Sequence, residues 1–159
     1  MTSLDRARLI AVLVPAALLA GAHGSQYLGG LTPCQMCYWQ RWPHFAALFL
    51  GLLSFALAGR MPDRGRSLVW LAALAILTSG AIGVYHAGVE LKIFEGFTQC
   101  AGLGGHGSLR DILAAPLVRC DQVQWSLLGI SMAGWNAILS IGFACLILWL
   151  SLRRPRIRT

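Results

Sequence analysis

The chain has 159 residues, of which 57% are hydrophobic and only 12% are charged, and its formal net charge is +7. A soluble domain carries about a quarter charged residues, so the composition excludes an ordinary soluble protein and indicates a membrane protein. The basic excess does not indicate nucleic-acid binding, because most Lys and Arg residues lie at the ends of apolar segments.

Four apolar segments are long enough, with their flanking residues, to cross a membrane as helices. A spanning helix needs about 20 residues, at ~1.5 Å per residue across ~30 Å of hydrocarbon. We expect residues 1–159 to form a single membrane domain, an all-α integral membrane protein built as a four-transmembrane-helix bundle. The expected spans are residues 9–28, 34–58, 68–86 and 126–152.

The first span also has features of a secretory signal peptide. Arg6 and Arg8 precede it, and Ala20-Gly21-Ala22 resembles a small-residue cleavage site. The apolar stretch continues to Leu28, which is longer than the core of an ordinary signal peptide. We therefore expect a retained helix, with cleavage after Ala22 as the alternative.

The distribution of basic residues predicts the orientation of the bundle. Membrane proteins carry an excess of Lys and Arg on the cytoplasmic side. Nine of the 13 basic residues precede the first span, separate the second from the third, or follow the fourth. We therefore expect cytoplasmic termini and two extracytoplasmic loops, residues 29–33 and 87–125. The nine residues are Arg6, Arg8, Arg60, Arg64, Arg66, Arg153, Arg154, Arg156 and Arg158.

The second loop is too long and too mixed to be a plain connector. Residues 101–107 are rich in glycine, which predicts a mobile segment. Ser108 and Asp111 then form the pattern of a capping box, which predicts a short helix over residues 109–115 that stops at Pro116. A mobile loop with a short helix suggests contact with a partner protein.

Four of the five cysteines fall on the extracytoplasmic side, namely Cys34, Cys37, Cys100 and Cys120. An even number of cysteines in an oxidising compartment suggests two disulfides, which are either structural or redox-active. The fifth, Cys145, lies in the middle of an apolar span, where we expect a buried, inert thiol.

Local chemistry favours reactivity in the stretch TPCQMCYWQR. Thr32 suits a helix N-cap and Pro33 a first helical position, so we expect Cys34 and Cys37 in the opening turns of the second span. Free backbone amides and the helix dipole stabilise a thiolate there. Arg41 falls on the same helix face and adds a cation, although it could instead extend toward the membrane surface.

Other interpretations of this pair are weaker. Covalent haem attachment needs His directly after the second cysteine, where this chain has Tyr38, and a thioredoxin-type motif needs a βαβ setting. Zinc would require Cys100 and Cys120 to join the first pair, but their wide spacing is unlike that of zinc ligands. We therefore predict no metal site.

Two cysteine pairs on one side of a membrane suggest a relay by thiol–disulfide exchange. A bridge that closes an exposed loop is accessible to an incoming thiolate. The relay needs a final electron acceptor, and the bilayer offers a lipophilic quinone. His86, at the outer end of the third span, is a candidate hydrogen-bonding residue near that depth, or an interfacial histidine with no role. His23, His44 and His106 are weaker candidates.

With these features the chain resembles the disulfide bond formation protein B (DsbB) family, particularly its alphaproteobacterial members. The segments that carry the resemblance are PCQMCYWQR, GVYHAGVE, CDQVQW and LGISMAGWN, and it extends over essentially the whole chain. It implies a quinone-dependent, disulfide-generating oxidoreductase of the bacterial inner membrane, with its active cysteines on the periplasmic side. The implied cofactor is ubiquinone or menaquinone, and the implied partner is a periplasmic thiol oxidase of the DsbA type.

The resemblance also implies a role for each extracytoplasmic cysteine. Cys34 and Cys37 would be the pair coupled to quinone, with Cys37 contacting it as a thiolate. Cys100 would be attacked by reduced DsbA, and Cys120 would exchange with Cys34.

The resemblance further implies that Arg41 would hold the quinone and that His86 would assist. The chain departs from the family at Gln40, where an acidic residue is common, and in its short, glycine-rich second loop. Two alternatives remain. One is a quinone-linked enzyme like vitamin K epoxide reductase, whose cysteine motif lies in its last spans. The other is a non-enzymatic membrane subunit with structural disulfides.

Overall fold

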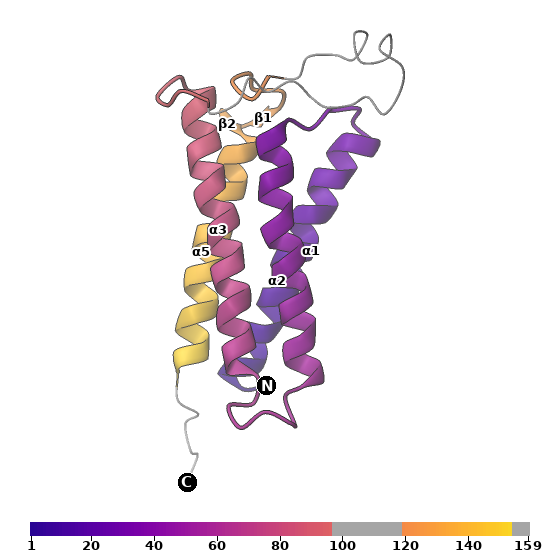
Figure 1. Ribbon diagram of the computed structural model, residues 1–159, viewed down its shortest axis with the longest axis vertical. Helices are drawn as coiled ribbons and strands as arrows, with labels where there is room; N and C mark the ends of the chain where they lie inside the picture. The colour runs from indigo at the N-terminus through magenta and orange to yellow at the C-terminus, as the bar shows by residue number, and fades with distance from the viewer. Residues whose placement is uncertain (97–118, 154–159) are drawn as a thin grey trace.

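The computed structural model describes residues 1–96 and 119–153, and in this part of the chain four long helices form one bundle (Figure 1). The N-terminus, the connection over residues 57–65 and the C-terminal end of α5 lie at one end of the bundle. The α1–α2 connection and a short β ribbon lie at the other. The elements are α1 (Ser3–Tyr27), α2 (Gln35–Ala56), α3 (Arg66–Glu90), β1 (Ser126–Leu127), β2 (Ile130–Ser131) and α5 (Met132–Leu152).

Three helices, α1, α3 and α5, are long and apolar enough to cross a membrane. Large apolar side chains, such as Phe49, Leu71 and Trp149, are exposed on the outer surface, as expected for a surface in contact with lipid. Helix α2 has 22 residues and packs against α1 and α3, but its N-terminal half carries polar residues including Gln40 and Arg41. The structure therefore agrees with a multi-pass membrane protein, and crossing by α2 remains a prediction.

Small residues let the helices approach closely in the apolar half of the bundle. Most of the core there is alanine, with Val69, Ile76 and Ile147 as the largest fully buried side chains. A Cβ added at Gly80 would lie 2.9 Å from Cγ1 of Ile141, so α3 and α5 approach so closely that any side chain at this position would have to displace its neighbours. Small residues at such contacts are typical of membrane helices.

Helix α2 begins later than the sequence predicts. Its N-cap is Cys34, whose Sγ accepts a hydrogen bond from the backbone amide of Cys37 at 3.3 Å. The prediction of Thr32 as the N-cap and Pro33 as the first helical residue is therefore wrong. A cysteine in extended conformation can cap a helix through sulfur as serine does through oxygen. This places the sulfur of Cys34 directly at the positive end of the helix dipole.

A two-residue antiparallel ribbon precedes α5, and the all-helical prediction did not include it. Ser126 pairs with Ser131, and Leu127 pairs with Ile130. The two turn residues, Leu128 and Gly129, both have positive φ, at 54° and 78°, as a type I′ turn requires. Short-range turn chemistry therefore sets the direction in which the chain enters α5.

Two sequence predictions concern other parts of the chain. The glycine-rich segment and the short helix over residues 109–115 lie outside the described residues, as does Cys100. Cys145 is a free thiol that is exposed on the outer face of α5, so the prediction that it is buried is wrong. Its neighbours Ala144 and Ile147 face the core, and the helical rotation of about 100° per residue turns Cys145 away from it.

Replacing Gly80 with valine is expected to destabilise the bundle by ~1–3 kcal/mol, because the new side chain would overpack the contact with Ile141 and Ser140. Gly142→Val is the matched control, since nothing lies within 4 Å of its position and it faces outward. Denaturant unfolding in mixed detergent micelles measures the free energy of unfolding of both variants. An equal loss of unfolding free energy in the two variants would show that only the helix propensity had changed.

Candidate functional site

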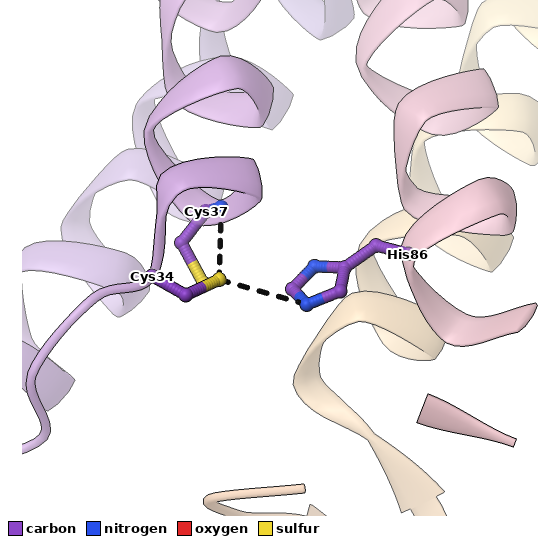
Figure 2. Close-up of side chains that lie close together, drawn as sticks. All are labelled: Cys34, Cys37 and His86. Atoms are coloured by element: carbon purple, nitrogen blue, oxygen red, sulfur yellow. Dashed lines mark hydrogen bonds between the residues drawn. The ribbon is translucent and has the colours of Figure 1, made fainter. Parts of the chain in front are cut away.

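The Cys34–Cys37 pair lies at the start of α2 and faces the last turns of α3. The two sulfur atoms are 3.0 Å apart, and Sγ of Cys34 is 3.6 Å from Nε2 of His86 (Figure 2). Cys34 is only 2% exposed and packs in one buried cluster with Met36, Val89 and Cys120. The fold therefore brings one cysteine of the second loop against the first pair and beside His86.

The cysteines are in different redox states. Cys34 and Cys37 are free thiols, whereas Cys120 is disulfide-bonded. Cys120 is 3% exposed, although it belongs to the long second loop. Disulfide exchange depends on access of one sulfur to another, and the fold places Cys120 in one buried cluster with Cys34.

Arg41 does not extend to the surface, because its side chain is buried against α1. Its guanidinium donates hydrogen bonds to Oε1 of Gln26 at 2.6 Å and to the carbonyl of Ala22 at 3.0 Å. It also lies 5.3 Å from the centre of the Tyr38 ring. Its Nε is buried and has no hydrogen-bond partner among the described residues. The position of Arg41 is thus fixed by α1, while its Nε–H remains a donor without a partner among the described residues.

A cavity of about 520 Å³ lies between α1, α2 and the start of α5, and it reaches the cysteine pair. Most of its wall area is apolar, with polar groups from the four helices and from the segment before β1, including Arg119, Gln122 and Gln124. An apolar wall with polar groups is typical of small-molecule sites. The predicted site residues Cys34, Cys37, Arg41 and His86 all line it, together with His44 and Asn136. The fold thus gathers these four residues, from two helices, around one cavity.

A buried chain of amide and imidazole groups extends from this site toward the middle of the bundle. Gln40 lies 2.8 Å from His86, and Asn136 joins Gln40 at 2.8 Å. His44 then joins Asn136 at 2.9 Å. Sequence reasoning gave His44 little weight and did not consider Asn136. Their occurrence in apolar helices was the available signal, because polar groups inside a membrane are costly and commonly functional.

The segment around Cys120 is joined to the end of α3 by an exposed ion pair between Asp121 and Lys92, and a second pair, with Arg119, lies within the segment. Asp121 accepts hydrogen bonds from Arg119 at 2.8 Å and from Lys92 at 2.5 Å. The pKa of Asp121 lies well below its usual range, because hydrogen bonds from Arg119 and then from Lys92 stabilise the carboxylate. The carboxylate therefore stays charged even below its ordinary pKa. The stabilisation by the ion pairs is fully present above that ordinary value and is lost as the pH falls through the lower pKa of the folded protein.

Comparison with known proteins identifies the family. The model of the family "Disulfide bond formation protein DsbB" matches residues 5–150. The chain belongs to the DsbB family. Disulfide bond formation protein B of Chromohalobacter salexigens is 32% identical over 148 residues, covering 88% of this chain and 84% of that protein. The protein of the same name from Hahella chejuensis is 29% identical over 154 residues and 91% of each chain.

An uncharacterised protein of Rickettsia prowazekii is also similar, with 24% identity over 151 residues, 91% of this chain and 84% of that protein. No solved structure matches the chain. Membership of the DsbB family makes the protein a membrane oxidoreductase of disulfide bond formation. The geometry of the thiol pair, Cys120 and the cavity can therefore be interpreted as that of a disulfide-forming site.

Replacing Asp121 with asparagine is expected to loosen the segment that carries Cys120, because both cations lose their charged partner. Hydrogen exchange of the amides of residues 119–122 at neutral pH should become a few-fold faster. Between pH 5 and pH 8, the wild-type protection should not change once intrinsic exchange is corrected, because Asp121 stays ionised.

Asp63→Asn is the control for this prediction. Asp63 accepts from the amides of Gly65 and Ser67 at the opposite end of the bundle. The Asp63→Asn variant should leave the hydrogen exchange of residues 119–122 unchanged. Unchanged exchange in the Asp121 variant would show that the ion pairs do not hold the segment.

Proposed function

We propose that this protein reoxidises a periplasmic dithiol oxidase of the DsbA type and passes the electrons through its two cysteine pairs to a membrane quinone. In this proposal all four helices span the inner membrane and both termini lie in the cytoplasm. The cysteine pair at the start of α2 then lies at the periplasmic surface. Helix α2 packs alongside the apolar helices, which supports this placement. The segments that contain the described residues Arg6, Arg60, Arg64 and Arg153 lie at the opposite end of the bundle (Figure 1) and support it too.

The proposed exchange conserves two electrons at each step. A thiolate of reduced DsbA attacks Cys100 of the Cys100–Cys120 disulfide, and Cys120 leaves as a thiolate. The second DsbA thiolate then resolves the mixed disulfide. Cys120 next attacks Cys34 of an oxidised Cys34–Cys37 pair, and Cys37 leaves. Closure of the Cys100–Cys120 disulfide releases Cys34, so the first pair ends as a dithiol.

The observation that carries this proposal is the packing of Cys120 against Cys34 in one buried cluster. The two residues are far apart in the sequence, and exchange requires their sulfur atoms to meet. His86 borders the same place, 3.6 Å from Sγ of Cys34. Two purely structural disulfides would not need to lie in contact with each other or to share a cavity.

The residues around the cavity fit a quinone. A quinone is a flat, largely apolar ring with carbonyl acceptors, so its site needs an apolar wall and a few donors. The cavity supplies both, and the unpartnered Nε of Arg41 is a buried donor. Arg41 would hold the ring, with Cys37 and His86 beside it. When bound, the quinone supplies the acceptor for two electrons and two protons from the Cys34–Cys37 dithiol.

Single Cys→Ala changes in purified protein should separate the relay from structural disulfides. Cys34→Ala and Cys37→Ala should abolish quinone reduction by reduced DsbA, because the first pair could no longer cycle. Cys145→Ala is the matched control and should leave the rate unchanged, because this thiol is exposed on the outer face of α5. Absorbance of the quinone measures turnover.

The Cys120→Ala variant tests the order of exchange. It should accumulate a mixed disulfide between DsbA and Cys100, which non-reducing electrophoresis and peptide mapping detect. Trapping through another cysteine would contradict the order of exchange. Full turnover in either variant of the first pair would contradict the relay itself.

Arg41→Ala should raise the KM for quinone by roughly 10–100-fold, because hydrogen bonds to charged groups contribute about 1.5–3 kcal/mol. The rate of thiol exchange with DsbA in a single turnover should change far less. Arg41→Lys should recover only part of the loss, because an ammonium lacks the planar donor set of guanidinium. An unchanged KM would show that Arg41 has only a structural role against α1.

A further inference from the structure

The two nitrogen atoms of the His86 ring face different groups. Nε2 lies 3.6 Å from Sγ of Cys34, which as a thiol can accept or donate, and 3.9 Å from Oε1 of Glu90. Nδ1 lies 2.8 Å from Nε2 of Gln40, which is the amide nitrogen. Figure 2 shows the ring between α3 and the cysteine pair, with Nε2 directed at the sulfur.

The orientation of the Gln40 amide is determined by two other contacts. Its nitrogen also donates to the backbone carbonyl of Met36 at 3.1 Å, and its oxygen accepts from Nδ2 of Asn136 at 2.8 Å. If the amide were turned over, its oxygen would face a carbonyl oxygen, and two NH₂ groups would face each other. Both arrangements are repulsive, and a buried polar group without a partner is costly. Gln40 therefore presents a donor to His86.

Asn136 is fixed in the same way. Its amide nitrogen lies 3.2 Å from the backbone carbonyl of Ser79, an acceptor that has no alternative role. Its oxygen accepts from Ser140 at 3.1 Å and lies 2.9 Å from Nε2 of His44. The backbone carbonyls of Met36 and Ser79 thus determine the orientation of both amides. Each amide N–H of Asn136 and Gln40 then points at an acceptor, and the last of these acceptors is Nδ1 of His86.

We propose that Gln40 is a positioning residue that holds neutral His86 with its proton on Nε2, where it faces the sulfur of Cys34. Because Nδ1 meets a donor, it must be the acceptor of the ring, and the single proton of neutral imidazole is then on Nε2. Asn136 keeps Gln40 in the required orientation. The role of this proton in thiol exchange rests on the proposed function, whereas its position follows from the hydrogen bonds alone.

The position of the proton has a chemical consequence for the thiol pair. The ligand atoms of Cys34, Cys37 and His86 lie within 4.8 Å of one another, so together they could hold a thiolate-binding metal such as zinc. A metal needs the lone pair of Nε2, and metal-bound histidines usually donate their other N–H to an oxygen acceptor. Gln40 offers a donor instead. The amide chain therefore gives Cys34 a hydrogen-bond donor and disfavours metal capture by the reduced pair.

The direct test is the ¹⁵N spectrum of protein labelled at histidine, in the neutral form of His86. Its signals are assigned as those lost in His86→Asn. We expect an unprotonated Nδ1 and a protonated Nε2 in the wild type. In Gln40→Glu, the carboxylate can only accept, so Nδ1 should become protonated. A protonated Nδ1 in the wild type would overturn the proposal, and so would an unprotonated Nδ1 in a folded Gln40→Glu variant.

The control is Gln26→Glu, which adds the same charge beside Arg41, where Gln26 accepts a hydrogen bond. It should leave the His86 signals as in the wild type. The wild-type spectrum needs neither a folded variant nor turnover. It therefore stays decisive if Gln40→Glu does not fold, and its result is independent of whether the protein reduces quinone.

A second measurement is the titration of the reduced proteins with Co²⁺, followed by the sulfur-to-cobalt absorption band. Changes around a metal-bound histidine typically alter metal affinity by about 10–100-fold. We expect Gln40→Glu to bind Co²⁺ tighter than the wild type by that factor, and Gln26→Glu to match the wild type. Cys34→Ala should lose the band. Equal affinity in Gln40→Glu and the wild type would overturn the role of the amide chain against metal capture.

Discussion

The arrangement of the site depends on one constraint, which is that polar groups buried in an apolar bundle must find partners within the protein. The hydrocarbon core of a membrane supplies no hydrogen-bond partners, and an unpaired buried amide or imidazole costs several kcal/mol. The chain from His86 through Gln40 and Asn136 to Nε2 of His44 meets this requirement across α3, α2 and α5, and Nδ1 of His44 is left without a partner among the described residues. A rotation or shift of any of these helices would break at least one of these contacts. The same contacts therefore set the rotation of α3 that directs His86 toward Cys34.

The small residues of α3 make this chain of contacts possible. Added at Gly83, a Cβ would lie 3.0 Å from the carbonyl of Ala133 and 3.1 Å from Nδ2 of Asn136. Glycine at this position lets α5 approach until Asn136 reaches both Ser79 and Gln40. Close packing and polar satisfaction thus depend on the same residues, and membrane helices commonly combine the two. The apolar half of the bundle serves the site by setting the distance between helices.

The two cysteines of the proposed exchange are held by different contacts. Cys34 caps α2 and is enclosed by Met36 and Val89, so its position depends on the bundle itself. Cys120 belongs to the second loop and is buried in the same cluster, whereas the exposed ion pair between Asp121 and Lys92 adds little to its stability. Burial beside Cys34, rather than surface charge, therefore places the loop cysteine.

Several features that depend on residues close together in the chain could be predicted from the sequence, although the N-cap of α2 and the β1–β2 ribbon could not. Hydrophobic length indicated the apolar segments, and the Cys34-x-x-Cys37 spacing with Arg41 indicated a reactive pair and the DsbB family. Only the tertiary structure determined which side chains meet. It moved the N-cap from Thr32 to Cys34 and turned Cys145 outward.

The amide chain is the clearest case of what only the tertiary structure decided. Gln40 and Asn136 lie 96 positions apart, and their contact depends on how far α2 and α5 are rotated about their axes. Hydrophobic periodicity specifies a rotation only where one face is clearly apolar, and these helices are apolar on nearly every side. A few buried polar groups and glycines therefore decide the rotation. Their effect appears only when the helices are packed together.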